Sequence, residues 1–206
     1  MILFSLAFMF FSIGLARPQI GAKLKEHQSK GAEVMIALDV SNSMLAQDYS
    51  PDRLQRAKLA ISRLVDKLNG DRIGLVLFAG TSFVQLPITT DYVSAKMFLG
   101  NISTESVPVQ GTAIGDAINT CIKSFSAQSE NSRAIIVITD GENHEDNPVE
   151  AAKTAASMGI SVYTIGVGSA QGQPIPMKGG LLKDSQGNIV VTKLDEATLK
   201  EVAKAG

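Results

Sequence analysis

The chain has 206 residues, of which 45% are hydrophobic and 19% are charged, and its formal net charge is −1. These values are typical of one globular domain with a short extension, and they exclude a disordered tail, a coiled coil and a low-complexity chain. The 19 basic and 20 acidic residues leave no basic excess, so no nucleic-acid partner is expected. A single cysteine excludes an internal disulfide framework and a cysteine-rich zinc site.

The N-terminal segment differs in composition from the rest of the chain. Residues 1–16 carry no charge, and Arg17 and Pro18 end the apolar run. A helix of this length would span about 24 Å, which is less than the roughly 30 Å of a bilayer's hydrocarbon core. We therefore expect residues 1–17 to be part of a transmembrane segment that begins before this sequence. A signal peptide cleaved after Gly14-Leu15-Ala16 and a buried core helix are the alternatives.

Residues 18–32 are polar and mildly basic, which is typical of a juxtamembrane linker. Basic residues beside a membrane span usually mark its cytoplasmic side, so the linker alone indicates a cytoplasmic domain.

From Glu33 onward, strand-like and helix-like segments alternate. Continuous apolar runs predict strands buried on both faces at 34–38, 73–79, 134–139 and 160–167. Residues 81–86 predict an edge strand that is paired to the second of these through a turn at Gly80. Apolar residues at helical spacing and capping residues predict helices near 53–68, 91–99, 113–125, 148–158 and 195–205. The alternation implies an α/β fold, with a doubly wound, mostly parallel sheet flanked by helices.

The segment from about 172 to 193 interrupts this alternation. Asp184-Ser185-Gln186-Gly187 is a turn signal between two short apolar runs, Leu181-Leu182 and Ile189-Val190-Val191. This pattern predicts a β-hairpin inserted into a domain that covers residues 33–206.

Three polar sequence motifs are expected at the carboxyl edge of the sheet. Asp39, Ser41 and Ser43 follow the first strand, and Asp140 ends the third buried strand. Thr112 precedes the helix at 113–125, where a threonine either caps the helix or turns its hydroxyl toward a ligand. Ligands bind outside the carboxyl ends of parallel strands, and hydroxyl and carboxylate oxygens suit Mg²⁺ or Mn²⁺. Glu142, Glu145, Asp146 and Glu150 are predicted to form a solvated acidic rim near this site, and the alternative for Glu142 is that its charge tunes the field of the site.

These residues resemble the von Willebrand factor A (VWA) domain. The resemblance covers about residues 33–170 and rests on the D-x-S-x-S run, the Gly111-Thr112 pair and the Thr139-Asp140-Gly141 strand end. It implies a metal-ion-dependent adhesion site (MIDAS) in which Ser41, Ser43 and Thr112 bind a divalent cation directly. Asp39 and Asp140 would bind the cation directly or through water.

A narrower resemblance is to the bacterial Bat (aerotolerance-operon) membrane proteins. It rests on the apolar span that ends in Leu15-Ala16-Arg17-Pro18-Gln19 and on the segments Gly172–Pro176 and Leu182–Val190. It implies an inner-membrane protein whose VWA domain faces the periplasm. That placement differs from the one that the linker charges indicate, and we adopt it as the expectation.

Together these features predict a non-enzymatic, metal-dependent protein-interaction module. An acidic side chain of a partner would complete the coordination of the cation, and other membrane subunits would be its partners in an envelope or stress-tolerance complex. A Mg²⁺-dependent phosphohydrolase is the alternative. It is disfavoured because Ser41 stands where a second aspartate would act as general acid. A structural membrane protein with a vestigial site is the third hypothesis.

Overall fold

The computed structural model describes residues 4–5, 11, 31–126, 131–143 and 145–206. The predicted transmembrane segment and linker therefore lie almost entirely outside the described residues. Within the described ranges, no helix has both the length and the apolar character needed to cross a bilayer.

Five strands form the central sheet in the order β3-β2-β1-β4-β5. Their bounds are Glu33–Asp39 (β1), Arg72–Phe78 (β2), Ser82–Thr89 (β3), Arg133–Thr139 (β4) and Ile160–Gly166 (β5). The strands β1, β2, β4 and β5 are parallel, and β3 is antiparallel to β2. The mostly parallel sheet and the antiparallel edge strand are thus confirmed.

Between residues 31 and 206, α-helices and short 3-10 helices alternate with the strands, and α6 follows the last strand. Their bounds are Asn42–Leu45 (η1), Arg53–Val65 (α2), Tyr92–Gly100 (α3), Thr104–Ser106 (η2), Ile114–Ser124 (α4), Pro148–Ser157 (α5) and Glu196–Ala205 (α6). Asp52, Asp91 and Asp195 cap the N-termini of α2, α3 and α6 by accepting backbone N–H groups, as the sequence predicts.

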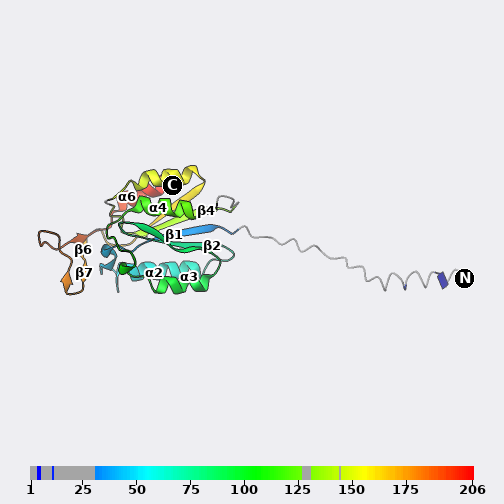
Figure 1. Cartoon of the computed structure of the whole chain (residues 1–206), viewed down its shortest axis with the longest axis horizontal. Helices are drawn as coiled ribbons and strands as arrows, with labels where there is room; N and C mark the ends of the chain where they lie inside the picture. Colours follow the sequence, from blue (N-terminus) through cyan, green and yellow to red (C-terminus); the bar gives the residue numbers. More distant parts are fainter. Residues whose placement is uncertain (1–3, 6–10, 12–30, 127–130, 144) are drawn as a thin grey trace.

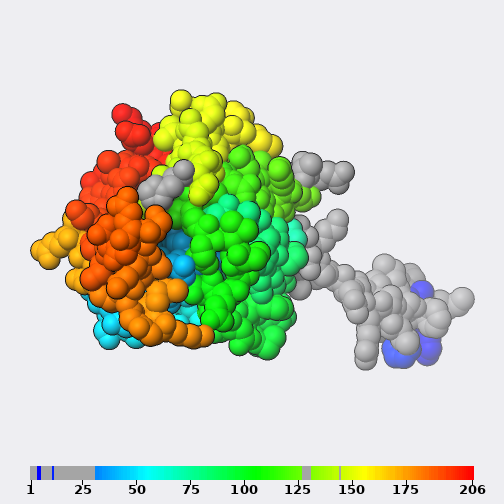
Figure 2. All heavy atoms as spheres, turned by 60° about the vertical axis from the view of Figure 1, so that its left-hand side comes forward, coloured from blue at the N-terminus to red at the C-terminus, as the bar shows by residue number. Residues whose placement is uncertain are grey.

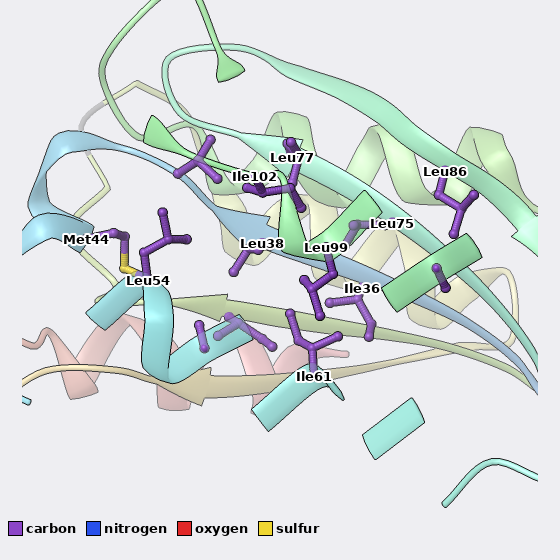
Figure 3. Packing of buried hydrophobic residues seen from close by; sticks show 14 of the residues in the cluster. Ile36, Leu38, Met44, Leu54, Ile61, Leu75, Leu77, Leu86, Leu99 and Ile102 are labelled. Atoms are coloured by element: carbon purple, nitrogen blue, oxygen red, sulfur yellow. The ribbon is translucent and has the colours of Figure 1, made fainter. Parts of the chain in front are cut away.

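The helices cover both faces of the sheet (Figure 1). Successive residues of β1 point to opposite faces, so Ile36 and Leu38 pack with α2 and α3, while Met35 and Ala37 pack with α4 and α5. Figure 3 shows the first of these two cores, where Ile61 of α2 and Leu99 of α3 lie close to the β1 side chains. Because β1 is buried on both sides, its C-terminal end is held firmly between its neighbours.

The inserted segment before α6 is built from two small ladders. β6 (Gln173–Pro174) pairs with β9 (Val191–Thr192), and β7 (Pro176–Met177) pairs with β8 (Gly180–Leu181). The predicted turn at Asp184–Gly187 is present, since Gly187 N–H donates to the Asp184 carbonyl. The predicted pairing is wrong for Leu181, which lies opposite Pro176. The chain folds back once more at Lys178-Gly179, where Gly179 has a positive φ.

The one cysteine of the chain gives a direct test of this packing. Cys121 is fully buried on α4, and burial raises the pKa of its thiol. We expect Ellman's reagent to leave the thiol unmodified in the native protein, and to titrate one thiol per chain at once in concentrated urea, because only the exposed thiolate reacts. Rapid modification in native buffer would contradict the packing of α4 on the sheet.

Candidate metal centre

The first segment of the site is the loop that follows β1. The Asp39 side chain is fully buried and accepts two hydrogen bonds, from the Ser41 N–H to Oδ1 (2.8 Å) and from the Thr139 hydroxyl to Oδ2 (2.6 Å). The hydroxyl oxygens of Ser41 and Ser43 lie 2.9 Å apart. The turn of η1 thus gathers both serine hydroxyls beside the end of β1.

The second segment is the loop before α4, where Thr112 is buried but does not cap the helix. The N-cap is Ala113, which makes no side-chain capping bond. Instead, the free N–H groups of the first turn donate to side chains of the loop after β4. Ile114 N–H donates to Asn143 Oδ1 (3.2 Å), and Gly115 and Asp116 N–H donate to the Asp146 carboxylate (3.0 and 2.6 Å). These bonds leave the Thr112 hydroxyl free of the capping role that the sequence allows for it.

The third segment is the end of β4, where Asp140 is fully buried in a polar network. Arg53 Nη1 donates to Asp140 Oδ2 (2.9 Å), and the same guanidinium pairs with Asp48 at 2.8 Å. Arg53 Nη1 also donates to the Thr192 hydroxyl (3.0 Å). That hydroxyl lies 3.0 Å from Asp140 Oδ2 and 2.8 Å from Glu142 Oε2. The inserted segment therefore reaches the back of the site through Thr192.

An open cavity of about 230 Å³ joins these segments. Three of the five predicted site residues, Ser41, Ser43 and Thr112, line it, and Glu142 and two apolar residues of the insert, Ile175 and Leu182, complete its wall. The two aspartates are fully buried and do not line the cavity, but each bonds to a serine that does: Asp39 accepts the Ser41 N–H, and Asp140 accepts a hydrogen bond from Ser43. The structure brings all five predicted residues together.

The electrostatics of the site favour a positive ion. Burial, and then the charge of nearby Asp140, raises the pKa of Asp39 to about 7, against hydrogen bonds from Thr139 and Ser41 that lower it. Burial also raises the pKa of Asp140, although hydrogen bonds and the Arg53 guanidinium act in the opposite direction. Arg53 pairs with Asp140, whereas no ion pair within the described part of the chain involves Asp39. Asp39 is thus a buried acid whose ionised form has no cationic partner among the described residues.

The donor set fits a hard divalent cation. Two carboxylates and three hydroxyls supply oxygen only, which is the ligand type that Mg²⁺ and Mn²⁺ prefer. Across the described ranges, no three or more His, Cys, Asp or Glu side chains lie close enough together to hold a metal ion. Any cation at this site would therefore depend on the serine and threonine hydroxyls.

Sequence reasoning missed the groups that support the site. Arg53, Asp48 and Thr192 belong to no motif, and their contacts depend on tertiary packing. Thr139 belongs to the Thr139-Asp140-Gly141 strand end, but its hydrogen bond to Asp39 was not predicted. The prediction of a solvated acidic rim is wrong for Glu142, whereas Asp146 is exposed as predicted and has a structural role in addition. Glu142 is half-buried and accepts the Lys193 N–H (2.9 Å) as well as its contact with Thr192, and Asp146 caps α4.

A parallel sheet with this arrangement of acidic and hydroxyl residues at its carboxyl edge defines a class of domain. The profile of the von Willebrand factor type A domain matches residues 33–204, and the chain belongs to that family.

Two solved structures are more similar to this chain than the family as a whole indicates. It is similar to BatB from Bacteroides thetaiotaomicron, with 57% identity and a TM-score of 0.83 over 85% of this chain and 87% of that one. An aerotolerance-related membrane protein from Bacteroides fragilis is 56% identical, with the same TM-score, over 85% of this chain and 88% of that one. An uncharacterized protein of Borreliella burgdorferi is 32% identical over 81% of this chain, and the chain spans about half (49%) of its length.

Proposed function

We propose that the site is a metal-ion-dependent adhesion site that holds one Mg²⁺ or Mn²⁺ ion. Ser41, Ser43 and Thr112 would bind the ion directly, and Asp39 and Asp140 would bind it directly or through water. The observation that supports this proposal is that three hydroxyl donors from two segments line one open cavity, while the carboxylates of Asp39 and Asp140 each bond to a serine of that lining.

The bound ion would make the chain a protein-interaction module. Five protein ligands leave one position of an octahedral ion free, and an Asp or Glu carboxylate of a partner protein is the group that suits it. No contact among the described residues favours the phosphohydrolase alternative, so we propose no reaction for this site.

The proposal extends to the cellular setting. Similarity to an aerotolerance-related membrane protein supports a membrane-anchored chain, and the apolar residues 1–17 would supply the anchor. We place the domain on the periplasmic side of the bacterial inner membrane, where it would join other subunits of an envelope or stress-tolerance complex.

A peptide selection tests the interaction. Random peptides displayed on phage are selected on the immobilised chain in Mg²⁺ and eluted with EDTA. We expect the enriched peptides to share an Asp or Glu, and replacement of that residue by Asn or Gln to abolish binding. Enriched peptides that bind equally well in EDTA, or that contain no required acidic residue, would contradict the proposed function.

A further inference from the structure

A second, larger cavity adjoins the candidate metal centre. It measures about 630 Å³, which is within the range of roughly 300–1,000 Å³ that is usual for ligand pockets. Its apolar lining comes from three separate parts of the chain: Leu45 of η1, Val107 after η2, and Pro176 and Met177 of β7. We refer to this cavity as the β7 groove.

The β7 groove and the cavity over the metal centre are neighbours that share two lining residues. Asn42 and Gln110 line both of them. Gln110 forms the shared wall, because its Oε1 accepts the Asn42 N–H (2.9 Å) and its Nε2 donates to the Thr104 carbonyl (3.1 Å). These two bonds fix η1 and η2 relative to each other and therefore hold the two cavities side by side.

Figure 2 shows this face of the molecule. The inserted segment, in orange, and the green chain that carries η2 border a hollow, and blue atoms of the β1 region lie at its base. Across the outer part of the β7 groove, Lys178 of the insert pairs with Glu105 of η2 at 3.0 Å. Both side chains are highly exposed, so this ion pair contributes little stability and opens readily to a ligand.

We propose that the β7 groove is the specificity pocket of the interaction site, and that one extended segment of a partner protein occupies both cavities. This inference rests on the proposed function. The acidic side chain of the segment would complete the coordination of the cation. An apolar side chain further along the segment would lie against Met177, Leu45 and Val107. The exposed fraction of Met177, 40%, leaves its flexible thioether free to adapt to such a side chain.

The geometry of an extended peptide limits the spacing between the two residues. Alternate side chains of an extended strand point to the same side, and each residue adds about 3.3 Å. An acid and an apolar residue that enter neighbouring cavities on one face are therefore expected two or four positions apart.

The test uses the peptides selected in Mg²⁺ on the full chain. We expect their consensus to pair the acid with a large apolar residue two or four positions away. We expect Met177→Lys to lower the affinity for a synthetic consensus peptide at least tenfold without changing the affinity for Mn²⁺.

The matched control is Met158→Lys. Met158 is a second exposed methionine, and its carbonyl accepts a bond from Arg133 at the start of β4, so it lies at the opposite edge of the sheet. This control is expected to bind the peptide as the unmodified chain does.

The outcomes separate the two proposals. If the acid and the cation are required but Met177→Lys and Met158→Lys bind alike, the inference about the groove is wrong and the proposed function stands. If Mn²⁺ does not bind, or if the acid is dispensable, the proposed function fails and the inference fails with it. Selection of no peptide at all would also contradict the inference.

Discussion

Replacing Arg53 with methionine is expected to destabilise the protein by about 3–5 kcal/mol. The Arg53 side chain is fully buried at the N-terminus of α2, where it donates to Asp48, Asp140 and Thr192. Methionine fills a similar volume but leaves two aspartates without their cation. Removing one partner of a buried ion pair is costly because the remaining charge stays desolvated.

Urea unfolding of the metal-free protein measures this loss. The free energy of unfolding of Arg53→Lys is expected to lie between those of the unmodified chain and Arg53→Met. A lysine keeps the positive charge, but its single ammonium cannot donate in two directions as the forked guanidinium does. The control is Arg56→Met on the same helix, where the guanidinium is exposed and lies 5.8 Å from the centre of the Tyr49 ring. Such a contact contributes only about 0.5–1 kcal/mol. If Arg53→Met loses no more stability than Arg56→Met, the bonds from Arg53 to Asp48, Asp140 and Thr192 do not support the fold.

Replacing Asp39 with asparagine is expected to abolish cation binding while leaving the metal-free protein folded and at least as stable at pH 8. The substitution removes one of two buried carboxylates that repel each other. Loss of an outer-shell contact weakens metal binding by roughly 10- to 100-fold, and loss of this carboxylate should cost more. Calorimetric titration with Mn²⁺ measures the affinity, and urea unfolding measures the stability.

The pH dependence of stability provides a second readout of the same substitution. The pKa of Asp39 is raised from an ordinary 3.8 to about 7, so the folded state binds this proton more tightly than the unfolded state does. The contribution of Asp39 to the free energy of unfolding therefore falls as the pH rises from 3.8 to about 7, and it is constant above that. The metal-free Asp39→Asn variant is expected to lack this fall. An unchanged slope in the variant would contradict the assignment of the effect to Asp39.

The local sequence predicted the sheet, and it indicated which side chains lie close together at the carboxyl edge, because both depend on short-range patterns. Buried apolar runs mark the parallel strands, and Asp39 and Asp140 end two of those strands, so their proximity follows from the topology. Asp52, Asp91 and Asp195 begin helices by bonds to residues only two or three positions away. Such contacts can be inferred from a few neighbouring residues.

The surroundings of the site could not be predicted, because they rest on contacts between distant segments. Arg53 donates hydrogen bonds to Thr192, which is 139 positions away in the sequence, and to Asp140, which is 87 positions away. Thr112 left two alternatives open, and the choice between them depends on Asn143 and Asp146, which cap α4 from another loop. The β7 groove likewise exists only because the insert folds over the edge of the sheet beside η2.

Anomalous diffraction from crystals of the protein soaked in Mn²⁺ tests the metal centre most directly. We expect one strong peak within about 2.0–2.3 Å of the Ser41, Ser43 and Thr112 hydroxyl oxygens, with Asp39 and Asp140 bound directly or through water. We also expect crystals of the Asp39→Asn variant to show no peak at that position. A peak elsewhere on the molecule, or no peak at saturating Mn²⁺, would contradict the proposal that these five side chains hold a cation.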